Sequence, residues 1–213
     1  MSPQPGLETI LRQAPVIPVV IVEDLAHAVP LARALVAGGL PVIEVTLRTS
    51  IGLEAIRAIA AEVPDAIVGV GTVLHPGQLT AAVEAGARFA VSPGATISIL
   101  DAAATVDMPI LPGIATASEA MALIERGYRF AKFFPAEPAG GIAYLSALAS
   151  PLPQLQFCPT GGVTLQSAPG YLALPNVICV GGSWMVGRAV VQAGDWTRIT
   201  AGATEAAALR RPV

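Results

Sequence analysis

Lysine is almost absent from this chain of 213 residues, in which Lys132 stands beside 11 arginines. Basic residues form no cluster and the net charge is -3, which gives no attraction to nucleic acid or anionic lipid. No apolar run reaches the roughly 18 uninterrupted residues that a membrane helix requires. Because 54% of the residues are hydrophobic, we expect one compact domain with a large core and small-molecule partners, and no nucleic-acid or membrane partner.

Cysteine is also scarce. The two cysteines, Cys158 and Cys179, lie in apolar runs and are too few for a disulfide scaffold. No Cys/His cluster has the spacing of a zinc site. We therefore predict reduced core thiols in a cytoplasmic protein, without a metal site.

Short apolar runs are abundant, and they recur along the whole chain. Eight of them begin at residues 15, 41, 66, 89, 108, 129, 154 and 177, on average about 23 residues apart. Helical stretches separate them. One, at 24–39, has Asp24 as an N-cap and glycines as a stop, with Pro30 expected to kink it or delay its start. Another, at 50–63, places Leu53, Ile56, Ile59 and Ala60 on one side.

Apolar strands that alternate with helices indicate parallel βα units, and eight of them predict a compact (β/α)8 TIM barrel. The stretch "LETILR" at 7–12 predicts an extra N-terminal helix. The expected layout is a single domain over 1–213, with the N-terminal helix in 1–14, the barrel in 15–200 and a C-terminal helix or tail in 201–213. An open doubly wound sheet is the alternative, although no GxGxxG opens a helix.

Strand alternation brings three charged residues together at one end of the predicted barrel. Residues of equal parity share a strand face, so Glu44 lies below Arg48 on one strand and Lys132 lies between Phe130 and Phe134 on another. If these faces point inward, the three charges converge near the mouth of the barrel. Two structural interpretations stay open, a lysine that snorkels from a strand edge and an internal Glu44–Arg48 ion pair without chemistry.

Arginine cannot replace lysine as an amine nucleophile. A lysine among Phe130, Phe133 and Phe134 and near Arg48 is penalised in its charged form, which favours the neutral amine. Such an amine attacks a ketone and forms a Schiff base, whose iminium accepts electrons from a neighbouring carbon–carbon bond. The accompanying proton transfers require a carboxyl group, for which Glu44 is the candidate.

Glycine pairs mark the ends of the last two predicted strands. Gly161-Gly162 follows "CPT", and Gly181-Gly182 precedes Ser183. Loops at these positions are the usual phosphate site of such barrels, because their backbone N–H groups approach the ligand closely. The sequence therefore predicts a ligand with a ketone near Lys132 and a phosphate at its far end.

Seven motifs together resemble the class I 2-keto-3-deoxy-6-phosphogluconate (KDPG) aldolases, including those that act on 4-hydroxy-2-oxoglutarate. They are "EVTLRT", "VGVGTVL", "FAVSPG", "ILPGIAT", "KFFPAE", "FCPTGGV" and "GGSWMV", and they span most of the chain. The resemblance implies a (β/α)8 homotrimer that needs no cofactor and releases pyruvate and D-glyceraldehyde 3-phosphate, or pyruvate and glyoxylate.

The resemblance also implies a role for each matching residue. Lys132 would form the Schiff base and Glu44 would be the general acid/base. The implied substrate-binding residues are Arg48 and Thr72 for the carboxylate, Pro93 and Phe134 for the pocket wall, Thr160 for stereochemistry at the hydroxyl, and Gly161, Gly162, Gly182 and Ser183 for phosphate. The resemblance gives no role to His75, which we interpret as a loop or capping residue, and His27 as a packing or surface residue.

Two other functions stay open at this point. A barrel isomerase or epimerase for sugar phosphates would use the same glycine loops with a carboxylate or a metal, and it would tolerate loss of the lysine. A catalytically silent binder of phosphorylated ligands would keep the loops and form no covalent adduct.

Overall fold

The computed structural model describes residues 3–106 and 108–209. Each of the eight apolar runs contains a strand, and the fifth contains two, which lie on either side of Pro112. The strands are β1 (Val16–Val20), β2 (Val42–Thr46), β3 (Ile67–Gly71), β4 (Ala90–Val91), β5 (Ile110–Leu111), β6 (Gly113–Ile114), β7 (Phe130–Phe133), β8 (Gln156–Pro159) and β9 (Val180–Gly182).

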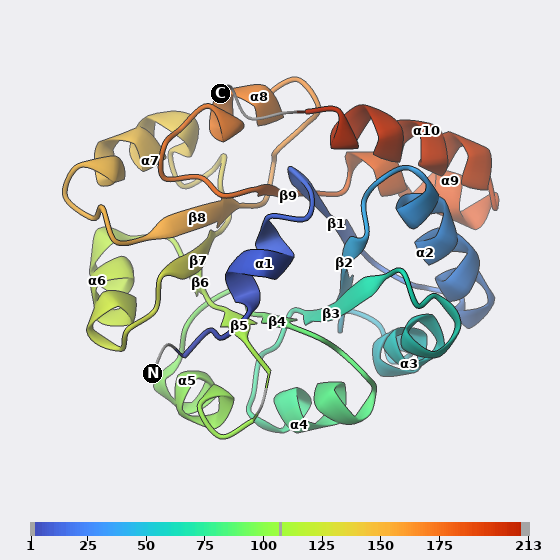
Figure 1. Cartoon of the computed structure of the whole chain (residues 1–213), viewed down its shortest axis with the longest axis horizontal. Helices are drawn as coiled ribbons and strands as arrows, with labels where there is room; N and C mark the ends of the chain where they lie inside the picture. The colour runs from blue at the N-terminus through green and yellow to red at the C-terminus, as the bar shows by residue number, and fades with distance from the viewer. Residues whose placement is uncertain (1–2, 107, 210–213) are drawn as a thin grey trace.

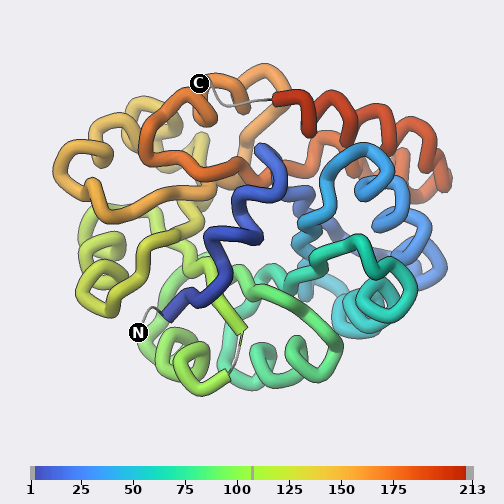
Figure 2. Tube along the Cα trace, viewed as in Figure 1, coloured from blue at the N-terminus to red at the C-terminus, as the bar shows by residue number. Residues whose placement is uncertain are grey.

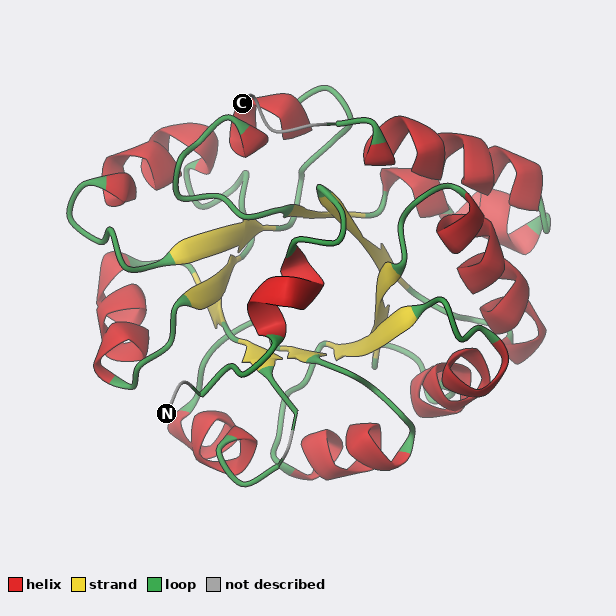
Figure 3. Ribbon diagram, in the orientation of Figure 1, coloured by secondary structure: helices red, strands yellow, loops and turns green. Residues whose placement is uncertain are grey.

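The sheet is parallel and curled. Six strands pair in the order β5-β4-β3-β2-β1-β9 and three in the order β6-β7-β8. Isolated parallel bridges, Phe157 with Val177 and Thr160 with Gly181, join the β8 and β9 segments. Figure 3 shows the strands curling around a common centre with the longer helices outside them. The protein thus has an α/β fold with a curled parallel sheet, and its long helices do not cover both faces as in the doubly wound alternative.

Helices follow the strands as predicted. They are α1 (Leu7–Leu11), η1 (Leu25–His27), α2 (Ala28–Ala37), α3 (Gly52–Glu62), α4 (Gly77–Glu84), α5 (Ile97–Ala103), α6 (Ala117–Glu125), α7 (Gly141–Ala149), α8 (Ala168–Leu172), η2 (Trp184–Val186), α9 (Arg188–Gln192) and α10 (Trp196–Ala207). Within the described residues, no helix is both long and apolar enough to cross a membrane. The last four residues of the predicted C-terminal tail, 210–213, lie outside the described residues.

Pro30 delays the helix that Asp24 opens, which is one of the two outcomes expected from the sequence. The Asp24 carboxylate accepts a hydrogen bond from the N–H of Ala26 and caps the short helix η1. Pro30 then lies in the first turn of α2. Backbone N–H groups in this turn make no hydrogen bond within the helix, so the N–H that proline lacks is not missed there. Gly38 and Gly39, the latter with φ 88°, end the helix as predicted.

The buried face of α3 differs slightly from the predicted one. Ile56 and Ile59 are buried as expected, together with Ala55. Ala60 is exposed, so its assignment to the buried side was wrong, and Leu53 is only partly buried. The two isoleucines, one turn apart, determine which face of the helix is buried, whereas a small alanine at the edge of that face has little influence on it.

Helix α1 covers the centre of the curled sheet at the end where the strands begin (Figures 1 and 2). Leu7 and Leu11 are fully buried in the cluster that fills the space between the strands. Gln4 fixes the preceding segment: its amide nitrogen donates to the carbonyls of Ile110 and Phe130, and its amide oxygen accepts from the N–H groups of Arg129 and Phe130. Helix α1 therefore occupies this end of the sheet, and the predicted site residues lie toward the opposite end.

Candidate active site

Lys132 and Glu44 meet inside the curled sheet. Lys132 lies on β7 and Glu44 on β2, and each is only 3% exposed. The Lys132 Nζ donates to Glu44 Oε1 at 3.2 Å and Oε2 at 3.5 Å. The contact joins residues 88 apart in sequence, and it confirms that strand alternation directs both side chains inward. Glu44 therefore pairs with the lysine, and the alternatives of a snorkelling lysine and a Glu44–Arg48 pair do not describe this geometry.

The surroundings of Lys132 are largely apolar. Its Nζ lies 5.3 Å from the centre of the Phe134 ring, and Cys158 is its neighbour in register on β8. Phe130 shares the interior cluster, as predicted. Phe133 was expected beside the amine, and that expectation was wrong. It lies on the outer face and stacks on Tyr144, with ring centroids 5.6 Å apart. Adjacent residues of a strand point to opposite faces, which is the physical reason for the error.

Gly71 makes room for the Glu44 carboxylate. The two residues lie on neighbouring strands, and a Cβ at position 71 would lie 2.6 Å from Glu44 Cγ and 2.8 Å from Cδ. Such separations are far below van der Waals contact, so any larger residue would displace the glutamate side chain. Sequence reasoning missed this role, because a glycine in "VGVG" carries no sign of which side chain lies across from it.

Arg48 and Thr72 lie together just beyond the ends of β2 and β3. The Arg48 Nε donates to Thr72 Oγ1 at 3.3 Å. Thr72 has φ 61°, a left-handed conformation that strains a β-branched residue by about 1–3 kcal/mol. Strain of this kind clusters at ligand sites. The structure thus brings together the two residues predicted to hold a carboxylate, and the guanidinium is exposed at the mouth.

Pro93 closely approaches β6, the strand that pairs with the one carrying Lys132. It follows β4, is partly buried, and faces Gly113, which is the register partner of Lys132. A Cβ on Gly113 would lie 2.7 Å from the Ser92 carbonyl oxygen and closer still to the Pro93 backbone. Gly113 therefore lets Pro93 reach the side of the site where Lys132 lies.

The first glycine pair forms a tight loop after β8. Gly161 has φ 100° and Gly162 φ 84°, conformations that only glycine adopts without strain. The preceding Thr160 is 6% exposed, and its hydroxyl donates to the Cys158 carbonyl at 3.4 Å. A Cβ on Gly181 would lie 2.9 Å from Thr160 Cγ2, so the second glycine pair lies against this threonine. The two loops are adjacent, as the sequence predicts.

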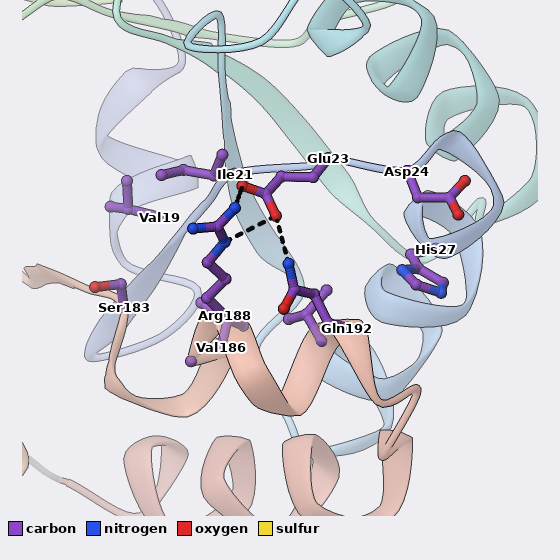
Figure 4. A pocket seen from close by; sticks show the side chains of 11 residues that line it. Val19, Ile21, Glu23, Asp24, His27, Ser183, Val186, Arg188 and Gln192 are labelled. Atoms are coloured by element: carbon purple, nitrogen blue, oxygen red, sulfur yellow. Dashed lines mark hydrogen bonds and ion pairs between the residues drawn. The ribbon is translucent and has the colours of Figure 1, made fainter.

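A cavity of about 440 Å³ lies beside Ser183, between the end of β1 and helix α9 (Figure 4). Its wall includes Val19, whose register partner is Glu44. Across the cavity, Arg188 makes a two-pronged ion pair with Glu23, with Nη2 to Oε1 at 2.9 Å and Nε to Oε2 at 3.0 Å. The sequence pattern gave no signal for this pair, because 165 residues separate its members.

Other candidates lie outside this cluster. His75 is an exposed loop residue before α4, where the Gln78 side chain accepts from its N–H. His27 ends η1 and packs edge-on against Trp196, with ring centroids 5.4 Å apart. Cys158 and Cys179 are both buried. Among residues 3–106 and 108–209, no group of three or more His, Cys, Asp or Glu is placed to hold a metal ion.

The chain is similar to known proteins over most of its length. A profile of the KDPG and KHG aldolases matches residues 7–202. The KHG/KDPG aldolase of Escherichia coli K12 is 54% identical over 199 residues, 93% of either chain. The chain belongs to the KDPG and KHG aldolase family.

Solved structures of family members are similar throughout. The KDPG aldolase of Legionella pneumophila superposes with a TM-score of 0.93 and 43% identity, covering 98% of this chain and 99% of its own. That structure holds pyruvate captured at low pH as a covalent carbinolamine intermediate. The KDPG aldolase of Zymomonas mobilis ZM4, solved with 3-phosphoglycerate, has a TM-score of 0.91 and 48% identity, covering 96% of each chain.

Proposed function

We propose that the protein is a class I aldolase that cleaves KDPG into pyruvate and D-glyceraldehyde 3-phosphate. One observation carries the proposal: the only lysine of the chain is buried with its Nζ 3.2 Å from the Glu44 carboxylate. A nucleophilic amine with an acid/base in hydrogen-bond reach is the arrangement that Schiff-base chemistry requires. Membership of the KDPG and KHG aldolase family supports the same reaction.

In the proposed reaction, the Lys132 amine attacks C2 of the 2-keto acid, and the carbinolamine loses water to give an iminium. Glu44 removes the proton of the C4 hydroxyl. The electron pair of the C3–C4 bond moves toward the iminium, which leaves an enamine and releases the aldehyde. Protonation of the enamine at C3 and hydrolysis of the new iminium release pyruvate and regenerate the amine. The iminium accepts the electrons, which is the role a metal ion fills in other aldolases.

The remaining site residues divide between the two ends of the substrate. Arg48 and Thr72, already joined by a hydrogen bond, would hold the carboxylate, and Pro93 and Phe134 would form the wall of this pocket. Thr160 would contact the hydroxyl whose stereochemistry the enzyme sets. The proposed phosphate site comprises Gly161, Gly162, Gly182 and Ser183.

The same site also suits 4-hydroxy-2-oxoglutarate, which would yield pyruvate and glyoxylate. The E. coli relative is named for both activities, and glycine loops accept a phosphate without requiring one. A direct comparison of turnover with the two substrates tests this second activity.

The sequence predictions on architecture and assembly are proposals as well. Two observations support a closed (β/α)8 barrel with α1 as an extra N-terminal helix. The two bridges join the β8 and β9 segments, and the fifth apolar run contributes β5 to one sheet and β6 to the other, on either side of Pro112. We propose that this barrel is a single domain, that it assembles as a homotrimer, and that it works in the cytoplasm. Sedimentation equilibrium measures the assembly directly.

Incubation with pyruvate followed by borohydride reduction tests the chemistry. Lys132 and the α-amino group are the only amines of the chain, so an adduct can be assigned with little ambiguity by peptide mapping. We expect one pyruvyl adduct, on Lys132, and a missing tryptic cleavage after it. Lys132→Arg keeps the positive charge and should show no adduct there and no turnover.

Arg129→Lys provides the control, since it places a second lysine on the loop before the same strand. In that variant the adduct should stay on Lys132. Folded wild-type protein without an adduct, or a Lys132→Arg variant with near-normal turnover, would exclude the aldolase mechanism and favour an isomerase or a silent binder.

A further inference from the structure

A buried tyrosine from α8 is hydrogen-bonded to the end of the lysine motif. The Tyr171 hydroxyl donates to Glu137 Oε1 at 2.9 Å. Tyr171 is fully buried, and Glu137 is the last residue of "KFFPAE", three residues beyond Phe134. The bond therefore connects the segment that leaves the catalytic strand to a helix that follows β8.

Glu137 also lies directly against the glycine loop. Its N–H donates to the Gly161 carbonyl at 3.0 Å. A Cβ on Gly162 would lie 2.6 Å from Glu137 Cγ and 2.7 Å from its Cβ, so the stem of the glutamate packs on the bare backbone of Gly162. One residue thus touches both glycines of the loop and is itself held by Tyr171.

Gly141 leaves space for this pair. It has φ 59°, and its N–H donates to the Ala136 carbonyl at 2.9 Å. A Cβ there would lie 3.2 Å from the Tyr171 hydroxyl and 3.4 Å from Glu137 Oε2. The chain therefore passes close to the pair without contributing a side chain to it.

The hydroxyl stays a donor over the whole neutral range. Burial, followed by the hydrogen bond and the negative charge of Glu137, raises the pKa of Tyr171 far above its ordinary value. Glu137 is thereby held in one orientation against Gly162.

We propose that Glu137, held by Tyr171, is a positioning residue for the phosphate end of the substrate: it fixes the Gly161-Gly162 loop so that its N–H groups are arranged before the ligand arrives. The inference rests on the proposed function, in which this loop receives phosphate. A preorganised set of backbone donors binds an anion more tightly than a loop that must be ordered first. The amine and carboxylate of the reaction lie on strands β7 and β2, outside this loop.

Two matched variants separate positioning from charge. Tyr171→Phe keeps the ring and the Glu137 charge but removes the hydrogen bond. Glu137→Gln keeps an oxygen that accepts from Tyr171 but removes the charge. For each variant, kcat and KM are measured with KDPG and with the same 2-keto acid lacking its phosphate, 2-keto-3-deoxygluconate, and thermal unfolding verifies the fold.

We expect Tyr171→Phe to raise KM for KDPG by about five- to tenfold, the effect of losing one hydrogen bond of ordinary net strength. Its kcat, and its KM for 2-keto-3-deoxygluconate, should stay within about twofold of wild type. Glu137→Gln should stay within about twofold of wild type with both substrates, as a conservative rescue of the bond.

Equal losses with both substrates would overturn the proposal, as would an unchanged KM for KDPG in Tyr171→Phe. A marked fall of KM for KDPG in Glu137→Gln would also overturn it, because charge repulsion would then be the role of Glu137. If Tyr171→Phe does not fold, Glu137→Ala takes its place, because it removes both the acceptor and the stem that packs on Gly162. A raised KM for KDPG with an unchanged KM for 2-keto-3-deoxygluconate then supports the proposal, and an unchanged KM for both substrates rejects it. Failure of the proposed function gives a different result, since wild-type protein would then cleave neither substrate.

Discussion

Gly71→Ala should displace the Glu44 carboxylate while keeping both Glu44 and Lys132 in the chain. The added methyl group would lie 2.6 Å from Glu44 Cγ and 2.8 Å from Cδ, where about 3.5–4.0 Å is the ordinary separation of carbon atoms. The glutamate arm must therefore move by about 1 Å to restore contact. Its Oε1 would then leave hydrogen-bond range of the Lys132 Nζ, from which it is now 3.2 Å distant.

This substitution is more informative than removal of Glu44 itself. Truncating Glu44 would leave the buried Lys132 ammonium without its carboxylate, and breaking a buried pair in this way destabilises a protein by about 3–5 kcal/mol. Gly71→Ala keeps both charges. We expect it to lower the free energy of unfolding by about 1–3 kcal/mol through overpacking, and to lower kcat by about 100-fold, because misplacement of a catalytic group by 1 Å has an effect of that order.

Turnover is followed as pyruvate release, coupled to NADH oxidation by lactate dehydrogenase. Borohydride trapping with pyruvate is run in parallel, since Lys132 is untouched and should still form an adduct. Gly77→Ala is the control: a Cβ there would meet only the His75 ring, at an ordinary 3.6 Å, in the first turn of α4. The control should match wild type in kcat and in unfolding temperature.

Near-normal turnover in folded Gly71→Ala would refute the assignment of Glu44, since the reaction would then not depend on where its carboxylate lies. Loss of the adduct together with turnover would refute the expectation that Lys132 is undisturbed, because the methyl group would then affect Schiff-base formation and not only the later proton transfer.

Two predictions concern stability. Gln4→Ala removes hydrogen bonds to four backbone groups, three of them buried, and should lower the free energy of unfolding by about 2–4 kcal/mol; a denaturant titration with an unchanged midpoint would contradict this. Burial of Glu119 opposes its ionisation, but hydrogen bonds from Ala115 N–H and from the hydroxyl and N–H of Thr116 outweigh it and lower its pKa below the ordinary 4.5. Its charged form therefore stabilises the fold at neutral pH, and the contribution disappears as pH falls through the lowered pKa. Glu119→Gln should be less stable than wild type at pH 7, and the difference should vanish in thermal melts at low pH; a constant difference would refute the sign.

Much of the fold was predictable, because its signals are local. A strand buried on both faces is apolar along its length, and every such run in the sequence contains a strand. The split of the fifth run is local as well, since Pro112 interrupts it, and its effect on pairing was not anticipated. Gln4 is different. Its partners lie 106 to 126 residues away, and nothing near a glutamine at the start of a chain indicates them.

Some residues of the site could likewise be predicted from local sequence, and others could not. Strand alternation predicted that Lys132 and Glu44 face each other, and the same rule, applied to the next residue, assigns Phe133 to the outer face where it stacks on Tyr144. Gly71 could not be assigned by any such rule. Its function depends on which side chain of β2 reaches it, and register between strands is set by the packing of the whole sheet.

The groups proposed for the reaction and those proposed for substrate recognition lie on different parts of the fold. The proposed reacting pair lies on β2 and β7, which are buried and have little freedom to move. The groups proposed to hold the two ends of the substrate lie on segments beyond the strands, where Arg48 meets Thr72 and where Glu137 meets Gly162. Changes in the segment where Glu137 meets Gly162 can therefore alter which aldehyde is accepted without moving the amine or the carboxylate. The dual activity in the name of the E. coli relative is consistent with this physical separation of chemistry from recognition.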